Sequence, residues 1–512
     1  MRSDPQATDS STLANPGAAA RLSTAFATLL ACAVLLPLLG HRSLAMWDEG
    51  IYAEIAREML HHSWLVPTWN YQPWFEKPPL LFWLTATLFH VFGATEFWSR
   101  AVSAFSGVAT VAVLHRFILR RFDLATAWIS TVILLSTFGY LHVCRAGEMD
   151  SLLALTETLA VIGLAQVNER RQSGWLLFWL AFAAALMTKG GASVVLPLTL
   201  ACVAIVERWR TEHLGRLMFG ILLFLAAVAP WHLAMWHRFG TAFTAQYLSL
   251  HVLERASSQI EGHHTHAWYY LLVLLVSAPP WVLLYPSSLV AALRERSRSG
   301  VRIFAVFALL VLIFFTLVQT RLPHYIAPAY PALSLVAAVF LARSLRQLFA
   351  RWQSSSSRAG ILLAAACLWG GMVILTGHAR KELHSPRMSN GMVTPDTHEL
   401  AALLKRTSDS TRLGDGPLLL WTDPPIAPIT TALFYSRMPV QQVSLFSDIP
   451  QPLIDEYTWS PVPLAGQISN NPRPLLAQRS ALTQLPSGVI FSPTASSGHW
   501  EIGTIVAPAH QP

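Results

Sequence analysis

Charged residues are scarce in this chain of 512 residues. Asp, Glu, Lys and Arg together make up 12% of it, whereas 53% of the residues are hydrophobic. A soluble surface needs roughly 25% charged residues, so the composition excludes an ordinary cytosolic enzyme and a disordered scaffold. The net charge of +8 does not indicate nucleic-acid binding, because the basic residues lie in separated loops between apolar runs. The composition therefore predicts a polytopic membrane protein.

Cysteine and lysine are also rare. The four cysteines show no C-x-x-C spacing and lie in or beside apolar runs: Cys32, Cys144, Cys202 and Cys367. This pattern excludes a zinc knuckle and a disulfide framework. Only four of the 36 basic residues are lysines: Lys77, Lys189, Lys381 and Lys405.

The apolar runs predict about eleven membrane spans, since a spanning helix needs about 20 mostly apolar residues. The runs cover residues 22–40, 99–118, 124–143, 150–167, 174–188, 191–206, 215–236, 267–290, 301–318, 325–342 and 359–376. The run 79–92 has only about 14 residues, a length that favours a re-entrant or interfacial element over a span.

The arginine-rich loops predict the orientation. If 79–92 is not a span, five such loops fall on one side and hold 16 of the 36 basic residues: 116–123, 168–172, 207–216, 294–302 and 343–358. The positive-inside rule then places these loops and the N-terminus in the cytoplasm. We therefore expect a multi-pass protein of a bacterial inner membrane, with its other face in the periplasm.

Three regions follow from this topology. Residues 1–21 are expected to form a disordered cytoplasmic tail, and residues 22–376 an all-α transmembrane domain whose first periplasmic loop is 41–98. Beyond residue 377, short apolar runs alternate with a helical stretch and with many Pro and Ser. This pattern predicts a small α/β domain over residues 377–512 on the periplasmic side.

The first periplasmic loop contains a helical pattern. Apolar residues recur every four positions, at Ile51, Ile55 and Met59. The charged residues are turned away from them: Glu54, Arg57 and Glu58. The pattern predicts a short amphipathic helix in the headgroup plane, anchored by the aromatic residues of the same loop.

Asp48 lies just before this predicted helix and has two interpretations. As an N-cap it would stabilise the helix by about 1 kcal/mol. As a general base at the membrane edge it would remove a proton from an acceptor hydroxyl. Glu49 competes with it for the second role.

The segment Phe75–Pro79 places an acid and a base, Glu76 and Lys77, directly before two prolines. The prolines fix the backbone where the re-entrant helix is expected to begin. Lys77 is a point charge suited to a lipid phosphate. The alternative is nonspecific binding of headgroups by an interfacial lysine.

Charged residues also lie at the periplasmic ends of two other pairs of expected spans. Glu148 and Asp150 lie between the third and fourth expected spans, where they either do chemistry or mark the interface. Lys189 precedes two glycines at another outer edge, where a helix C-cap is the alternative.

Arg321, His324 and Tyr325 join the ninth and tenth expected spans. Pro323 breaks the helix there, and the three side chains offer hydrogen-bond donors to a phosphate. The alternative is a kinked helix end with a snorkelling arginine.

The loop 237–266 is rich in histidine and invites a metal-site interpretation. His264 and His266, with Glu76, form the candidate ligand set for a divalent metal, the one cofactor considered. The spacing is not that of a helical zinc pair, so a solvated loop is the alternative. Glu76 joins the set only if the two loops meet.

Together these segments fall on one membrane face, next to a soluble domain on the same side. A transporter would instead place its charged or broken-helix site near the bilayer midplane, between related halves. A reaction at the outer leaflet on a lipid-phosphate substrate fits better. A lipid-linked-sugar flippase and a polysaccharide polymerase or ligase are the rival classes.

Six segments resemble a known family, in the same order over roughly residues 20–345. They are W-D-E-G-I-Y-A-E-I-A-R-E-M from Trp47, W-L-V-P from Trp64, F-E-K-P-P-L-L from Phe75, E-F-W-S-R from Glu96, M-D from Met149 and R-L-P-H-Y from Arg321. The chain resembles the ArnT-type glycosyltransferases, the aminoarabinose transferases of lipid A. That family is related to the dolichyl-phosphate-mannose protein mannosyltransferases and has the GT-C fold.

The resemblance implies an inverting transfer of a sugar from a polyprenyl phosphate, with an aminoarabinose-like pentose or a hexose as the sugar. The acceptor would be lipid A, a protein or another glycan; a protein O-mannosyltransferase-like enzyme is one alternative. Asp48 matches the family's base, Lys77 and Tyr325 match contacts to the donor phosphate, and Asp150 matches the second acidic motif.

Glu76 matches an acid found near a metal in relatives. The chain departs from the family at two positions: Arg321 stands where a Lys is usual, and His324 where a Thr or Ser is usual. It also has about eleven expected spans rather than thirteen.

Overall fold

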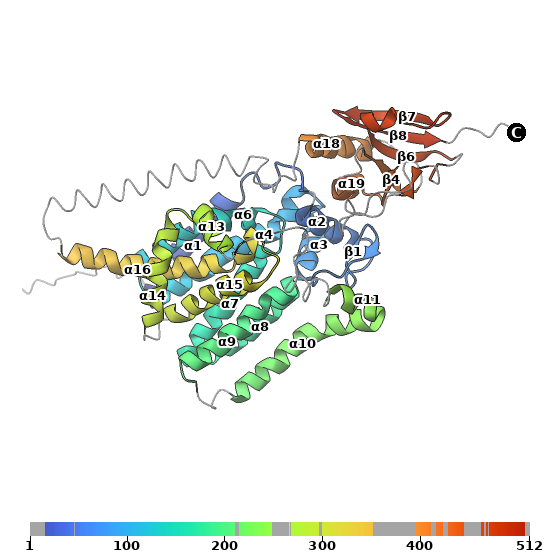
Figure 1. The fold of residues 1–512 in the computed structure, drawn as a ribbon. Coiled ribbons are helices and arrows are strands. Elements are labelled where there is room, and N and C mark those ends of the chain that lie inside the picture. The colour runs from blue at the N-terminus through green and yellow to red at the C-terminus, as the bar shows by residue number, and fades with distance from the viewer. Residues whose placement is uncertain are drawn as a thin grey trace, which may run out of the picture.

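The fold is seen in a computed structural model (Figure 1). The structure describes residues 16–45, 47–209, 214–247, 266, 268–295, 300–351, 395–410, 416–422, 429–444, 462–464, 467–468 and 471–506. The tail 1–15, the eleventh expected span and His264 lie outside these ranges. A large helical part is joined to a smaller part that contains a six-stranded sheet.

The helical part runs from residue 16 to residue 351. Its α-helices are α1 (Pro16–Leu35), α2 (Asp48–Met59), α3 (Leu80–Phe92), α4 (Glu96–Arg121), α5 (Leu124–Leu135), α6 (Phe138–Arg145), α7 (Asp150–Asn168), α8 (Ser173–Lys189), α9 (Val195–Val206), α10 (Leu214–Phe239), α11 (Thr241–Thr244), α13 (Tyr269–Ser277), α14 (Tyr285–Arg294), α15 (Val301–Leu317) and α16 (Ala329–Arg351). Among the described residues, three 3-10 helices lie between them: η1 (Gly190–Val194), η4 (Trp281–Leu284) and η5 (Pro323–Ile326).

Several of these helices are suited to a membrane. Within the described residues, six stretches are long and apolar enough to cross one: Gly17–Leu35, Glu96–Arg121, Asp150–Asn168, Ser173–Val206, Leu214–Phe239 and Ala329–Leu348. The bent pair α5 and α6 adds a seventh. Ser173–Val206 breaks at Gly190, which has a φ of +48° and separates α8 from α9. The expected multi-pass helical class is therefore confirmed, without the full count of eleven.

Two expected spans are interrupted. The run 124–143 bends by 67° between α5 and α6. At the bend, the hydroxyls of Ser136 and Thr137 donate hydrogen bonds back to carbonyls of the preceding turn, which competes with the helical ladder. The run 267–290 breaks between α13 and η4, where Pro279 and Pro280 supply no N–H to a helix.

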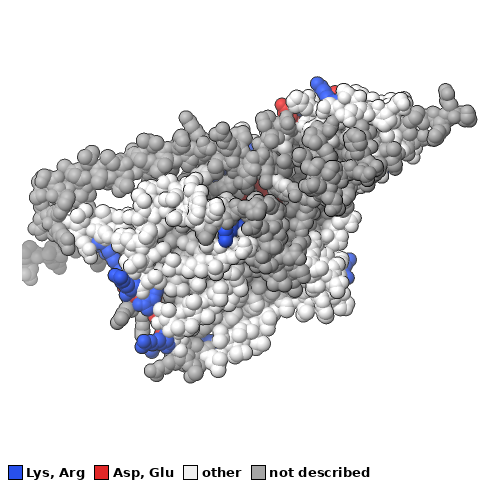
Figure 2. Space-filling model, in the orientation of Figure 1, with Lys and Arg blue, Asp and Glu red and all other residues white. Residues whose placement is uncertain are grey.

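The five arginine-rich loops meet at one end of the helical part. Four ion pairs connect all five loops to one another: Arg121 with Glu169, Glu207 with Arg302, Glu295 with Arg343, and Asp123 with Arg346. Figure 2 shows blue Lys and Arg side chains gathered near α14 and α16, while most of the rest of this face is uncharged. The loops therefore share one side, as the count of basic residues requires.

The predicted helix exists as α2, and its charged residues are buried within the protein. Glu54 and Glu58 are fully buried, and Arg57 is 5% exposed. Helices α3 and α19 (Ile429–Ser436) and strand β1 (Thr68–Trp69) pack around α2. Arg57 donates two hydrogen bonds to Glu54, which partly offsets the cost of burying both charges.

A β-hairpin follows α2. Strand β1 pairs antiparallel with β2 (Gln72–Pro73), and the two turn residues, Asn70 and Tyr71, both have positive φ. This is the backbone geometry of a two-residue hairpin turn, and Asn adopts it more readily than most residues.

The C-terminal part is a mixed α/β unit, as the sequence predicts. Its strands are β3 (Leu418–Trp421), β4 (Val440–Ser444), β5 (Val462–Pro463), β6 (Arg473–Gln478), β7 (Ile490–Ser497) and β8 (Trp500–Val506), in the order β5-β4-β3-β6-β8-β7. The first four of this order pair in parallel, and β8 and β7 are added antiparallel. Helices α18 (Pro395–Ser410), α19 and α20 (Arg479–Leu482) complete it.

This C-terminal unit is fastened to the start of the helical part (Figure 1). Tyr435 on α19 accepts a hydrogen bond from the backbone N–H of Leu44 and donates one to Glu96. Lys405 on α18 pairs with the same Glu96 carboxylate. The Asn70 side chain also exchanges two hydrogen bonds with the backbone of Val440 on β4.

Candidate active site

A buried ion pair fixes the chain just before α2. Glu49 is 2% exposed and accepts hydrogen bonds from Arg100 Nε and Nη2 at 2.6 and 2.9 Å. It also accepts from the backbone N–H groups of Ala45 and Gly147. Burial alone would raise the pKa of Glu49, but the Arg100 charge and these hydrogen bonds lower it to about 2. Glu49 is therefore a structural anion, which removes it as a rival base.

Asp48 is the first residue of α2 and lies half-buried beside this ion pair. Trp47 occupies the N-cap position, and no side chain caps the helix start. The N-cap interpretation of Asp48 is therefore wrong. Asp48 instead interacts electrostatically with Glu148 and Lys189, which come from two other segments.

Glu148 and Asp150 lie where the loop after α6 enters α7. The hydroxyl of Ser103 on α4 donates a 2.7 Å hydrogen bond to the backbone carbonyl of Glu148, which fixes the loop. Asp150 is 2% exposed and accepts a 2.7 Å hydrogen bond from Lys189 Nζ at its Oδ1. A buried carboxylate is stabilised by such a partner.

Lys189 connects this acidic segment to η5. It is the last residue of α8, where Gly190 ends the helix as the capping interpretation expects. Its ammonium lies 4.9 Å from the ring centre of Tyr325, a cation–π distance. One lysine thus contacts two residues that the sequence places in separate motifs.

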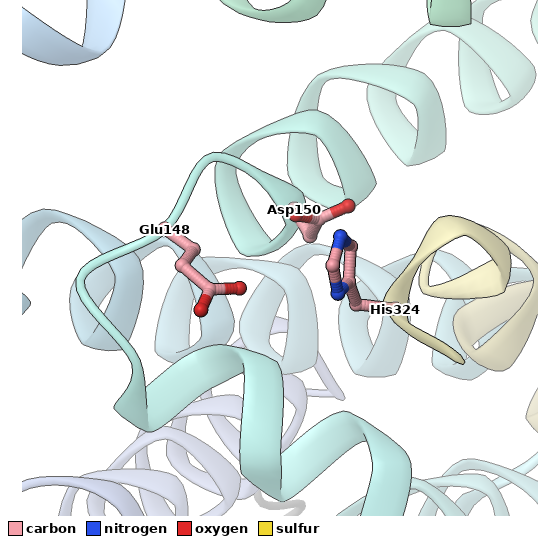
Figure 3. Close-up of side chains that lie close together, drawn as sticks. All are labelled: Glu148, Asp150 and His324. Atoms are coloured by element: carbon pink, nitrogen blue, oxygen red, sulfur yellow. The ribbon is translucent and has the colours of Figure 1, made fainter. Parts of the chain in front are cut away.

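Three titratable groups gather between α7 and η5. The ligand atoms of Glu148, Asp150 and His324 all lie within 4.8 Å of one another. Figure 3 shows His324 reaching from its own segment toward the two carboxylates. Two carboxylates and an imidazole at this spacing can share a proton or hold a cation.

The surroundings of the Glu148 carboxyl favour its protonated, neutral form. Burial raises its pKa well above the ordinary value, and the charges of Asp48, Asp150 and Glu49 raise it further. Lys189 opposes the shift. Glu148 Oε2 is buried and has no hydrogen-bond partner among the described residues.

Two further cations, Lys77 and Arg321, were expected from the sequence to contact a phosphate. Lys77 is half-buried between β2 and α3, two residues before Pro79, the N-cap of α3. A side chain added at Gly190 would come within 3.8 Å of Pro78, so the Lys77–Pro78 segment lies close to the end of α8. Arg321, just before η5, donates a 2.7 Å hydrogen bond to the carbonyl of Thr316.

The metal set expected from sequence is not assembled within the described residues. Glu76 is 7% exposed, whereas His266 is exposed and stacks on Trp268. His264 lies outside the described residues. In the described part of the chain, the His, Asp and Glu side chains close enough to share an ion are instead Glu148, Asp150 and His324.

The sequence did not connect Lys189 or His324 with the acidic pair Glu148 and Asp150. Lys189 stood out as one of four lysines at the end of an apolar run, but its partners on α7 and η5 are far away in the chain. His324 was noted as a hydrogen-bond donor to a phosphate and as a departure from the family pattern. Its proximity to the acidic pair depends on tertiary packing.

Comparison with known sequences gives a consistent set of relatives. Residues 76–236 match the family model described as dolichyl-phosphate-mannose-protein mannosyltransferase. An undecaprenyl phosphate-alpha-4-amino-4-deoxy-L-arabinose arabinosyl transferase of Erwinia tasmaniensis is 33% identical over 62% of this chain and 59% of its own. An uncharacterized protein of Aquifex aeolicus is 30% identical over 59% of this chain and 69% of its own. The chain thus spans about three fifths of the length of the Erwinia relative.

Solved structures share the fold. The crystal structure of ArnT from Cupriavidus metallidurans bound to undecaprenyl phosphate matches with a TM-score of 0.72 and 21% identity, over 94% of this chain and 97% of that one. The oligosaccharyltransferase of Archaeoglobus fulgidus matches with a TM-score of 0.53 and 15% identity, over 82% of this chain and 64% of that one.

Proposed function

The chain belongs to the ArnT-like family with the GT-C fold, and on that premise we propose that it is a glycosyltransferase that uses a polyprenyl-phosphate sugar. The donor follows from the names of its relatives, one of which was solved with undecaprenyl phosphate bound. The sugar is an aminoarabinose-like pentose or a hexose. The acceptor is lipid A or another molecule on the periplasmic side.

Asp48 is the proposed catalytic base. The observation that carries the proposal is its position: a half-buried carboxylate at the start of α2, beside the cluster of Asp150, Lys189 and Tyr325. Glu49 is fully occupied by Arg100 and by backbone N–H groups. A base must reach the proton that it abstracts, and half-burial leaves Asp48 open to an acceptor hydroxyl.

Lys77, Tyr325 and Arg321 are the proposed contacts of the donor phosphate. The Lys77–Pro78 segment and the Tyr325 ring both adjoin the end of α8, on either side of Lys189 and Gly190. Donors placed where charge develops in the transition state are usually the largest source of rate enhancement. The acids Glu148 and Asp150 form the second acidic motif of the same site.

The reaction follows from these roles. Asp48 removes the proton from the acceptor hydroxyl as its oxygen attacks the anomeric carbon. The bond from that carbon to the phosphate oxygen breaks on the opposite face, so the configuration inverts. The polyprenyl phosphate leaves as an anion, whose charge Lys77, Tyr325 and Arg321 stabilise.

The proposed orientation places this site and the C-terminal unit in the periplasm. It is supported by the meeting of the five arginine-rich loops at one end, while Asp150 and Lys189 lie at the opposite ends of α7 and α8. Residues 22–376 would form the catalytic domain and residues 377–512 the periplasmic one.

The experiment compares cells with and without this gene. Mass spectrometry of lipid A and of outer glycans should find one pentose or hexose that is lost on deletion and restored by the intact gene. Identical profiles, together with no consumption of polyprenyl-phosphate sugars by the purified protein in lipid nanodiscs, would exclude the transferase. A flippase would restore the modification with Asp48→Asn, whereas a transferase would not.

A further inference from the structure

Tyr435 on α19 reaches from the C-terminal unit to the segment that leads into α2. Its hydroxyl accepts a hydrogen bond from the backbone N–H of Leu44 at 3.1 Å and donates one to Glu96 Oε1 at 3.0 Å. Tyr435 is 4% exposed, so both bonds are shielded from water. A side chain of the C-terminal unit therefore holds the backbone of the helical part a few residues before Asp48.

The start of α2 depends on contacts from outside the helix. No side chain caps the helix, and its first residue is Asp48. Such a start is left with backbone N–H groups that have no partner within the helix. The chain before it is held by other side chains, because Arg100 donates to carbonyls in the segment 39–43 and Glu49 accepts from the N–H of Ala45.

The N–H of Leu44 is the part of this segment that Tyr435 holds. Leu44 is 2% exposed, and its N–H donates to no other residue in the described part of the chain. A buried N–H that loses its acceptor is unfavourable, so without the hydroxyl the segment should shift until the N–H reaches water. Glu96 would keep Lys405 as a partner in that case. The bond to Leu44 is thus the contact for which the described residues offer no substitute.

Helix α19 gives the Tyr435 hydroxyl a rigid support. It packs on α2, and the two helices share one hydrophobic core, with Leu433 and Phe434 from α19 and Ile51 and Ile55 from α2. Close-packed cores transmit displacements rather than absorb them. The position of α19 therefore determines where the hydroxyl meets the segment before Asp48.

We propose that Tyr435 is a positioning residue for the transfer reaction, so that the C-terminal unit helps to set the place of the catalytic base. The Tyr435 hydroxyl fixes Leu44, and the chain from Leu44 leads into the helix that Asp48 begins. This inference rests on the proposed function, in which Asp48 takes the proton of the acceptor hydroxyl. Tyr435 acts only through that carboxylate. A misplacement of about 1 Å can lower a reaction rate by about 100-fold, even when its cause lies far from the chemistry.

The test compares Tyr435→Phe with Asn70→Gly in the purified full-length protein in nanodiscs. Each variant removes two buried hydrogen bonds between the C-terminal unit and the helical part, since the Asn70 side chain exchanges two with the backbone of Val440. Asn70 has a φ of +50°, which glycine adopts without strain. Both variants therefore weaken the attachment of the unit, but only Tyr435→Phe alters the segment before α2.

The measured quantities are kcat and the donor KM, at a temperature at which all the proteins are fully folded. A loss of stability alone does not change kcat under these conditions. We expect Tyr435→Phe to lower kcat by ~10-fold with an unchanged donor KM. Asn70→Gly should keep the kcat of the wild type, although its Tm falls as well.

A double-mutant cycle then tests whether Tyr435 acts through Asp48. In the Asp48→Asn background, Tyr435→Phe should lower the remaining single-turnover rate no further, because the base that Tyr435 positions is gone. The same ~10-fold loss in both backgrounds would overturn the proposal, since Tyr435 would then act on something other than the base.

Two further results would overturn it. One is a kcat of Tyr435→Phe equal to that of the wild type. The other is an equal loss of kcat in Tyr435→Phe and Asn70→Gly, which would show that attachment of the unit matters in general and the bond to Leu44 does not. A wild-type protein that transfers no sugar would instead contradict the proposed function, so the two failures are distinguishable.

Discussion

Arg100 and Glu49 form a buried two-pronged ion pair directly beside Asp48. The same guanidinium donates to the backbone carbonyls of Leu39, Arg42 and Ser43. Arg100 thus ties helix α4 to the segment that leads into α2, and it sets the position of Asp48. The residue after the proposed base is structural, and its contacts explain why an acid is needed there.

Removal of Arg100 should therefore destabilise the protein. Arg100→Met leaves the buried Glu49 carboxylate without its charged partner, with only the N–H groups of Ala45 and Gly147, which costs roughly 3–5 kcal/mol. We expect a clearly lower Tm in detergent and a partial recovery in the double variant with Glu49→Gln. Arg343→Met is the control, because its ion pair is 48% exposed on the Arg side and should contribute ~0–1 kcal/mol. Equal Tm values for Arg100→Met and the wild type would contradict this role.

Lys77→Ala should impair use of the donor. Without its ammonium, the leaving phosphate loses a stabilising charge, so we expect a higher KM for the polyprenyl-phosphate sugar and a lower kcat. Steady-state kinetics with purified protein measure both. Lys405→Ala, which removes an equal charge from the C-terminal unit, should leave the donor KM unchanged. A donor dependence that is the same in Lys77→Ala would argue against phosphate contact.

Tyr435→Phe should loosen the attachment of the C-terminal unit. It removes the acceptor for Leu44 N–H and one donor to Glu96, each a bond with a net contribution of about 1 kcal/mol. We expect a lower Tm and faster proteolysis after residue 377. Tyr269→Phe serves as the control, because Tyr269 lies at the start of α13, outside the C-terminal unit and apart from the Leu44 and Glu96 contacts. Unchanged proteolysis in Tyr435→Phe would show that the hydroxyl is dispensable.

Glu58 should make stability depend on pH. Burial, and then the charge of Glu54, raise the pKa of Glu58 to about 8 in the folded protein. The folded state therefore binds more protons than the unfolded state above the ordinary Glu pKa of about 4.3. Stability should fall as the pH rises from there to about 8, and this fall should level off above 8.

The variant Glu58→Gln isolates this effect. Its amide cannot ionise, so its Tm should decline less between pH 5 and pH 8 than that of the wild type. Tyr71 N–H can still donate to the amide oxygen in place of Glu58 Oε2. Parallel Tm–pH curves for the two proteins would show that Glu58 does not titrate in this range.

The sequence was a good guide to local structure. Apolar runs predict helices because a membrane-spanning helix satisfies its own backbone, and α4, α7 and α10 follow them closely. The apolar runs did not predict where helices break. Two runs are interrupted at hydroxyl and proline residues, near Ser136 and Pro280. Strands β3 and β4 coincide with two of the short apolar runs beyond residue 377, at 417–421 and 440–445.

Tertiary contacts limited the rest. The sequence predicts an interfacial helix at α2 because part of its cover, helix α19, comes from the C-terminal unit, far away in the chain. Glu148, Asp150 and His324 meet only because α7 and η5 pack at the same end of the bundle. Each segment taken alone could be explained by an interfacial charge or a kinked helix end. The sequence does not show that the side chains meet, because they are far apart along the chain. Lys77 and Tyr325 were singled out as phosphate contacts by their residue types and positions, and the resemblance implied the same role.

The most direct test of the account is a single-turnover reaction of Asp48→Asn in nanodiscs. The amide keeps the shape of the side chain but cannot accept the acceptor's proton, so the variant should fold and bind undecaprenyl phosphate like the wild type. We predict that transfer from a bound polyprenyl-phosphate sugar then falls by at least ~10²-fold, in keeping with the loss of a general base. Transfer at a rate close to that of the wild type would contradict the role of Asp48 and, with it, the proposed mechanism.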